Sequence, residues 1–128
     1  MRLLLDTHIL LWTAGNPERL SPTIRGLLAD NQNQLYFSVA SAWEIAIKVN
    51  AGRLVFPLEE LHSTLAAQRL ILLDITLPHA MAAAALPPHH NDPFDRMLIA
   101  QARMEALLLV TADGMIPTYD VKTLSARA

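Results

Sequence analysis

Four acidic residues, far apart in the sequence, have side chains of the type that binds divalent cations: Asp6, Glu44, Asp95 and Asp113. Asp6 directly follows the apolar run 3–5, and Asp113 follows the apolar run 107–110. Each of the four is expected at or just beyond the carboxyl end of a buried strand. Because open α/β sheets bind ligands outside the carboxyl ends of their strands, the four carboxylates are expected to converge on one edge of a sheet.

Such a group of carboxylates is costly unless something compensates its charge. Two carboxylates about 6 Å apart repel each other by roughly 3 kcal/mol at an effective dielectric of about 20. A whole domain is stable by only about 5–15 kcal/mol, so several such pairs would rival that stability. A divalent cation relieves the repulsion, and oxygen ligands favour magnesium or manganese over zinc. The pattern therefore predicts a metal-dependent hydrolase that acts on phosphodiester bonds.

Each acid also has an ordinary structural explanation when it is taken singly. Asp6 is a suitable N-cap for a following helix. Glu44 lies four residues before Lys48, a spacing typical of a helical ion pair worth only about 0.3–0.5 kcal/mol. Asp95 is expected in the first turn of a helix, where the dipole favours a carboxylate, and Asp113 lies in an ordinary turn sequence. Only the joint placement of all four on one edge favours a metal site.

The histidines offer a second set of metal-binding side chains. His89 and His90 could form a zinc site with Asp92, but their spacing matches no standard zinc pattern. We therefore expect both histidines in a solvated loop, and Asp92 as the N-cap of the helix that follows it. His8 is expected to form a wall of the pocket beside Asp6.

The elements that must position these residues alternate between strand and helix along the whole chain, which is typical of an α/β fold with a mostly parallel sheet. No internal repeat or linker divides residues 1–128, so we expect a single domain. The expected strands cover residues 3–5, 35–37, 70–75 and 107–110, with a short edge strand near 119–121. The expected helices pass through residues 9–12, begin at Ser21-Pro22, pass through 43–47, begin at Pro57, run from Pro78 to before Pro87, and run from Asp92-Pro93 to about Glu105.

Composition narrows the class of protein. The chain is 52% hydrophobic and 17% charged, less charged than the average domain at about 25%, so part of its apolar surface is expected to serve a dimer or partner interface. The formal net charge of −2 provides no overall basic field for coating nucleic acid. A polyanionic substrate would therefore need local basic residues or bound cations.

Two absences exclude further classes. The chain has no cysteine, which excludes disulfides and thiolate metal sites. No stretch approaches the roughly 20 apolar residues of a membrane span, and the first residues are too short for a signal-peptide core. We therefore expect a soluble, unprocessed protein of the cytoplasm, with no membrane partner.

Four motifs, in this order and over essentially the whole chain, resemble those of the PIN-domain family. More narrowly, they are similar to VapC-type toxins of bacterial type II toxin–antitoxin pairs. The motifs are Asp6-Thr7-His8 with Leu11-Trp12, then Trp43-Glu44, then Asp92-Pro93-Phe94-Asp95-Arg96 with Ile99-Ala100-Gln101-Ala102, and finally Thr111-Ala112-Asp113.

The resemblance implies a three-layer α/β/α sandwich with a short, mostly parallel central sheet. It also implies an endoribonuclease that depends on magnesium or manganese and forms the toxin of a toxin–antitoxin pair. The four acidic positions of the family fall on Asp6, Glu44, Asp95 and Asp113, which would hold one or two cations that activate water. Asp6 and Asp95 would be the principal ligands, with Glu44 and Asp113 completing the site directly or through water.

The same resemblance implies roles for other residues and for partners. Thr7 and Thr111 would position a ligand or water by hydrogen bonding. Arg96, Lys48 and Arg53 are candidates for contacts with the RNA backbone, although solvated surface charge explains them as well. The expected partners are the RNA substrate, a cognate antitoxin whose tail occupies the acidic groove, and a second copy of the chain in a homodimer.

Two other functions compete with this interpretation. Residues 71–78 look like the phosphoacceptor strand of a receiver-like signalling switch. That class requires an adjacent acidic pair after its first strand, whereas Asp6 is followed by Thr7, and it requires a lysine after its last strand, which is missing. A catalytically silent PIN-like binding module would instead retain the acids only for stability. Metal titration and Asp→Asn substitution discriminate this module from the nuclease.

Overall fold

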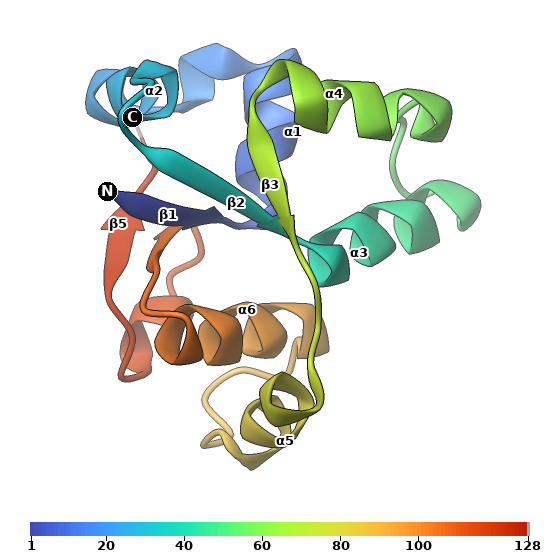
Figure 1. Cartoon of the computed structure of the whole chain (residues 1–128). Coiled ribbons are helices and arrows are strands. Elements are labelled where there is room, and N and C mark those ends of the chain that lie inside the picture. The colour runs from blue at the N-terminus through green and yellow to red at the C-terminus, as the bar shows by residue number, and fades with distance from the viewer. Residues whose placement is uncertain (128) are drawn as a thin grey trace.

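The centre of the fold is a sheet of five short parallel strands in the order β3-β2-β1-β4-β5 (Figure 1). It is seen in a computed structural model, which describes residues 1–127. Strand β1 is central, with β2 on one side and β4 on the other. The strands are β1 (Arg2–Leu5), β2 (Gln34–Ser38), β3 (Leu70–Leu73), β4 (Leu108–Thr111) and β5 (Thr123–Ser125).

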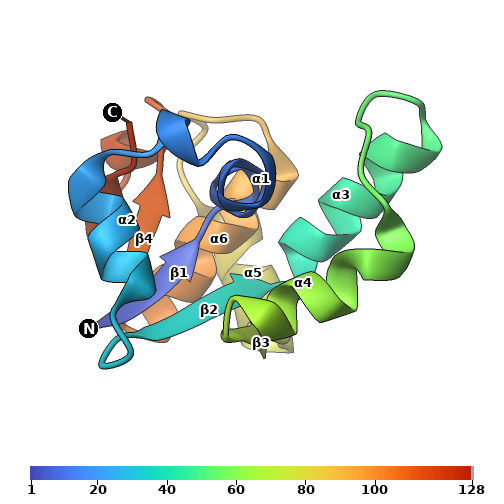
Figure 2. The ribbon, with the colours of Figure 1, turned by 90° about the horizontal axis from the view of Figure 1, so that it is seen from above.

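Helices cover both faces of this sheet, so the three-layer α/β/α arrangement is confirmed. Figure 1 shows α1, α2 and α4 on one side of the strands and α5 and α6 on the other. Figure 2 shows α3 running outward from the end of β2 before the chain returns through α4. The helices are α1 (Thr7–Gly15), α2 (Pro22–Ala29), α3 (Val39–Asn50), α4 (Leu61–Ala67), α5 (Leu77–Ala85) and α6 (Pro93–Met104), with short 3-10 turns η1 (Pro17–Arg19), η2 (Leu58–Glu60) and η3 (Ile116–Thr118).

The alternation of side chains along β1 divides the core between the two helical layers. Leu3 and Leu5 pack with α1 and α2, whereas Leu4 points to the opposite face and packs with α6. All three leucines are at most 1% exposed. Strands buried on both faces are continuous apolar runs, as parallel sheets require. This burial holds the carboxyl end of β1, and therefore Asp6, in a fixed position.

Side-chain caps set the starts of several helices, among them α3 and α6, which carry Glu44 and Asp95. The hydroxyl of Ser21 accepts the backbone N–H of Ile24 at the start of α2, and that of Ser38 accepts the N–H of Ala40 at the start of α3. Asp92 caps α6 by accepting two backbone N–H groups, including that of Asp95. Each cap contributes about 1 kcal/mol and determines where its helix begins.

The expected edge strand near 119–121 is wrong, because β5 lies at Thr123–Ser125. Residues before it form the 3-10 turn η3, and the buried Tyr119 directs its hydroxyl to the carbonyl of Pro87 instead of joining the sheet. The third strand also ends earlier than expected, at Leu73, because Thr76 is needed as the N-cap of α5. None of the helices within residues 1–127 is long and apolar enough to cross a membrane.

Candidate metal centre

The carboxyl ends of β1 and β4 lie side by side at the centre of the sheet. The strand order reverses between these two strands, and such a switch point is where open α/β sheets bind ligands. Asp6 immediately follows β1, and its N–H donates to the carbonyl of Val110 in β4 at 3.0 Å. Asp113 lies two residues beyond the end of β4. Two of the four acids therefore reach this point directly from neighbouring strands.

Asp6 is both the N-cap of α1 and a buried carboxylate of the site. Its Oδ1 accepts the N–H of Ile9 at 3.2 Å, and its Oδ2 accepts the hydroxyl of Thr111 at 2.5 Å. The side chain is almost wholly buried, with the residue 3% exposed. Capping α1 and belonging to the acidic site are therefore compatible for Asp6, because the capping hydrogen bond helps to orient its carboxylate.

Asp95 lies in the first turn of a helix, as expected, but not at the end of a strand. It does not follow a strand, because α6 comes after α5 and a loop, and Asp95 is the third residue of α6. The start of α6 is held near α3 by an edge-on contact between Phe94 and Trp43, whose ring centroids are 5.5 Å apart. Expecting Asp95 at a strand end was wrong, and a helix start instead delivers it to the strand ends.

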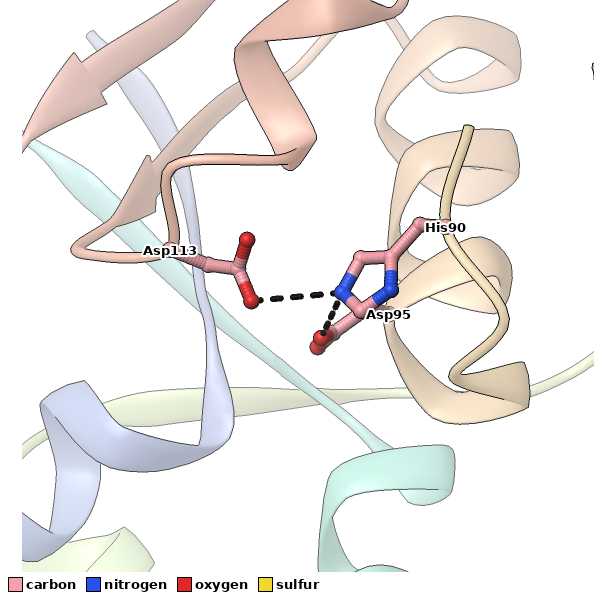
Figure 3. Close-up of side chains that lie close together, drawn as sticks. All are labelled: His90, Asp95 and Asp113. Carbon is pink, nitrogen blue, oxygen red and sulfur yellow. Dashed lines mark hydrogen bonds and ion pairs between the residues drawn. The ribbon is translucent and has the colours of Figure 1, made fainter. Parts of the chain in front are cut away.

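Asp95 and Asp113 meet at the imidazole of His90 (Figure 3). Nε2 of His90 lies 2.9 Å from Oδ2 of Asp95 and 3.2 Å from Oδ2 of Asp113. One potential ligand atom from each residue falls within 4.8 Å of the others. The other oxygen of Asp113 accepts the N–H groups of Met115 and Ile116, which orients its carboxylate toward the cluster.

The position of His90 corrects the expectation of a solvated loop. Its side chain is only 17% exposed. The backbone N–H of His90 donates to the hydroxyl of Tyr119 at 2.7 Å, and its backbone carbonyl accepts from Arg96 at 3.3 Å. The considered zinc set of His89, His90 and Asp92 is not formed, because the ring of His89 packs against Tyr119 instead. Sequence reasoning missed His90 because only the loop conformation brings it to Asp95.

The expectation of Glu44 at a strand end is also wrong, because Glu44 lies in the second turn of α3, which follows β2. Both of its carboxylate oxygens are occupied. Its Oε1 accepts the hydroxyl of Thr7 at 2.6 Å, and its Oε2 pairs with Nζ of Lys48 at 2.7 Å. The ion pair expected from the i, i+4 spacing is therefore present. Because Thr7 directly follows Asp6, its hydroxyl connects Glu44 to the site, although Glu44 does not join the cluster of His90, Asp95 and Asp113.

The buried carboxylates hold protons more tightly than free ones. Burial, followed by the negative charges of Asp92, Asp113 and Asp6, raises the pKa of Asp95 to about 7. Burial also raises the pKa of Asp6, against the hydrogen bond from Thr111. In both residues burial is the largest cause, so the charged carboxylate is unfavourable in the protein itself. A bound cation would compensate that charge.

The other two groups of the cluster shift in favour of their charged forms. Burial disfavours the charged form of His90, but the adjacent Asp113 and Asp95 outweigh it and raise the pKa of the imidazole. Burial opposes the charge on Asp113 as well, but hydrogen bonds from Met115 and His90 lower the pKa of this carboxyl. His90 therefore partly compensates the carboxylates in the absence of a metal.

The carboxylates of this region fit a hard divalent cation. Carboxylate oxygens suit magnesium and manganese. The atoms of Asp95, Asp113 and His90 are already as close as ligands of one ion, within 4.8 Å. Asp6 lies close enough for its charge to act on Asp95.

A cleft of about 330 Å³ opens beside these carboxylates. Asp6 and Asp113 line one part of it, and His8 forms part of its wall, as expected from the sequence. The remaining lining residues are Trp12, Arg19, Ala112 and Arg127. A larger cavity of about 780 Å³ lies near Arg2 and Leu108, at the opposite ends of the strands, and none of the four acids lines it.

The basic residues expected to contact RNA are differently placed. Arg96 is not a free surface charge, because its guanidinium donates to the carbonyls of Pro87, Ala83 and Leu86, among others. It holds together the loop between α5 and α6. Lys48 is engaged by Glu44, and Arg53 is exposed in the turn after α3.

The fold agrees with those of several solved structures. VapBC2 from Rickettsia felis bound to a promoter DNA fragment superposes with a TM-score of 0.74 at 18% identity, covering 98% of this chain and 99% of that chain. DNA-bound VapBC from Salmonella typhimurium gives 0.71 at 16% identity, covering 98% of both. FitAcB from Neisseria gonorrhoeae gives 0.64 at 23% identity, covering 97% and 96%.

Sequence comparison gives the family itself. No curated protein sequence matches the chain significantly. The model of the PIN domain matches residues 3–122, which is nearly the whole chain and includes all four acids: Asp6 after β1, Glu44 in the second turn of α3, Asp95 at the start of α6 and Asp113 after β4. The chain therefore belongs to the PIN domain family.

Proposed function

We propose that this protein is an endoribonuclease that depends on magnesium or manganese and acts as the toxin of a toxin–antitoxin pair. The observation that carries the proposal is the convergence of Asp95, Asp113 and His90 beside the buried Asp6 at the switch point of the sheet. Membership of the PIN domain family supports nuclease chemistry at this point.

Asp6, Asp95 and Asp113 would hold the cation, with Glu44 acting directly or through water. When bound, the cation supplies an activated water and neutralises charge that develops on the phosphate. The protein contributes the orientation of the ligands. The hydroxyl of Thr111 orients Asp6. The hydroxyl of Thr7 and the ammonium of Lys48 orient Glu44.

The partner chemistry follows from the exposed apolar surface and from the structural relatives. Trp43 is 61% exposed, and Leu77 and Met81 on α5 are 76% and 66% exposed. Such surface is consistent with an antitoxin, a second copy of the chain, or both. The structural relatives named above include complexes of a toxin with its antitoxin, which supports the first partner. We place this activity in the cytoplasm, where RNA and antitoxin would both be present.

The receiver-like alternative is wrong. Residues 71–78 include β3, which is an edge strand, whereas Asp6 and Asp113 lie at the centre of the sheet. The match to the PIN domain model, over residues 3–122, includes residues 71–78 and assigns them to another family. The catalytically silent binding module is the alternative that the next experiment tests.

The proposed function is tested by incubating purified protein with total cellular RNA and magnesium or manganese. Controls are EDTA and the Asp95→Asn variant, whose fold is checked by circular dichroism. We expect discrete fragments that require both the metal and Asp95. A protein that is stabilised by magnesium in a thermal melt but leaves every RNA intact would support the silent binding module instead.

A further inference from the structure

Two arginines line the cleft beside the carboxylates without forming an ion pair to them. Arg19 and Arg127 share the cleft with Asp6 and Asp113. Among the ion pairs of residues 1–127, none involves either arginine. Guanidinium groups near carboxylates usually pair with them. Their positive charge is therefore available to an anion that enters the cleft.

Long-range backbone contacts attach to each other the two segments that carry these arginines. Arg127 is bridged in antiparallel fashion to Leu20, the neighbour of Arg19. The adjacent Ala126 donates its N–H to the carbonyl of Thr111 at 2.9 Å. The last described residues are thus attached both to the end of β4 and to the segment that follows η1. This arrangement places both arginines at the same edge as the metal ligands.

Side-chain contacts hold each guanidinium while leaving other donors free. The guanidinium carbon of Arg19 lies 4.6 Å from the ring centroid of Trp12, in a cation–π contact. Nε of Arg127 donates to the carbonyl of Ala112 at 3.1 Å. Neither contact uses the terminal nitrogens of Arg127 or any hydrogen-bonding donor of Arg19. Arginine in this state is suited to bidentate contact with phosphate.

The size and polarity of the cleft identify the ligand class. Its volume of about 330 Å³ is that of a small-molecule pocket, which is enough for a short segment of one strand. Its lining combines carboxylates, which favour a cation, with arginines, which favour an anion. A single strand of RNA with its scissile phosphate at the metal and its next phosphates at the arginines satisfies both.

We infer that Arg19 and Arg127 bind the phosphates next to the scissile bond of a single-stranded RNA. This inference rests on the proposed function, because it takes the position of the scissile phosphate from the metal site. Arg19 and Arg127 thereby take the place of Arg96 and Lys48 as the proposed RNA contacts. The charges of Arg96 and Lys48 are engaged within the protein.

The test measures RNA binding separately from cleavage. The full chain with Asp95→Asn is titrated against a short fluorescein-labelled single-stranded RNA of mixed sequence, and anisotropy is followed over a range of salt. The double variant Arg19→Gln and Arg127→Gln is compared with Arg103→Gln, which removes an exposed charge on α6 away from the cleft. Replacing both cleft arginines with lysine keeps the charge and controls for folding.

Removing two phosphate contacts should lower the salt slope by about 1.4, at about 0.7 for each contact with a single strand. At about 0.15 M salt the affinity should fall roughly tenfold, while Arg103→Gln retains most of it. The lysine variant, which keeps the charge but not the bidentate geometry, should lose less affinity than the glutamine variant. The inference is overturned if the double glutamine variant binds with the affinity and salt slope of Arg103→Gln, or if the parent protein binds no RNA.

Cleavage by the same arginine variants without Asp95→Asn separates this inference from the proposed function. If the parent cleaves RNA and the double variant does so with an unchanged KM, only the inference about the arginines fails. If the parent shows no metal-dependent cleavage, the proposed function fails. A variant that selectively loses binding to an acidic peptide, with RNA affinity intact, would assign the arginines to a protein partner and overturn the inference.

Discussion

The hydroxyl of Thr111 lies 2.5 Å from Oδ2 of Asp6 and connects residues that are 105 positions apart. Thr111 is the last residue of β4, and Asp6 directly follows β1, so the parallel pairing of these strands brings them together. Because Oδ1 of Asp6 is engaged by Ile9, the carboxylate has a fixed orientation toward the site. A metal ligand held in this way needs little reorganisation when the cation binds.

Replacing Thr111 with valine should therefore weaken metal binding. Valine has a similar shape but no hydroxyl, and loss of a hydrogen bond that orients a ligand costs about 10–100-fold in metal affinity. Calorimetric titration with manganese measures the effect. The matched control is Thr64→Val on the distant α4, which removes a hydrogen bond from the Thr64 hydroxyl to the backbone carbonyl of Glu60. Equal affinities for the two variants would contradict the orienting role of Thr111.

The stability of the metal-free protein should fall as pH rises from about 4 to about 7. The pKa of Asp95 is about 7 in the folded protein and 3.8 in the unfolded chain, so the folded state holds an extra proton in this range, and stability is lost as that proton leaves. Asp6 shifts in the same direction. The loss should reach a few kcal/mol, because one pKa unit corresponds to about 1.4 kcal/mol.

Urea denaturation at several pH values checks this prediction. Asp95→Asn cannot ionise, so its unfolding free energy should change less over the same range. The raised pKa of His90 extends the loss above about pH 6.5, since the protonated imidazole stabilises the folded state below that value. Saturating magnesium should flatten the parent curve. A metal-free protein that becomes more stable between pH 4 and 7 would contradict the raised pKa values of Asp95 and Asp6.

Replacing His90 with glutamine should destabilise the metal-free protein and enlarge the stabilisation by magnesium. The imidazole donates to two carboxylates, Asp95 and Asp113, and a hydrogen bond to a charged group is worth about 1.5–3 kcal/mol. Without it, only the cation compensates those charges. The shift in melting temperature on adding magnesium, measured near pH 6, tests this expectation.

The control for this measurement is His62→Gln, because His62 is exposed on α4. It should melt like the parent with and without magnesium. A smaller magnesium shift in His90→Gln than in the parent would instead make the imidazole of His90 a ligand of the metal.

Replacing Arg96 with glutamine should lower stability by about 1–3 kcal/mol. Its guanidinium donates to backbone carbonyls of residues 83–90, and partly buried acceptors would lose their partner. Urea denaturation measures the cost, and Arg103→Gln on the exposed side of α6 should remain within about 0.5 kcal/mol of the parent. An unchanged stability, together with weakened RNA binding, would restore Arg96 as an RNA contact.

Features that depend on neighbouring residues could be predicted from the sequence. The apolar run 3–5 followed by Asp6 predicted a buried strand that ends in a carboxylate, and the pair Asp92-Pro93 predicted the start of α6. Alternating strands and helices predicted the parallel sheet. Burial of apolar side chains and satisfaction of free N–H groups at helix starts are local requirements, so the sequence pattern records them.

The sequence by itself therefore determined the layered fold, the helix starts and the family motifs, whereas only the tertiary structure decided which charges meet. His90 reaches Asp95 because Tyr119 and Arg96 hold its loop, and Arg127 joins Arg19 in lining the cleft because a bridge pairs Arg127 with Leu20. Contacts of this kind join residues from distant segments through irregular backbone. Their geometry depends on how the whole core packs, and no local pattern of residues records it.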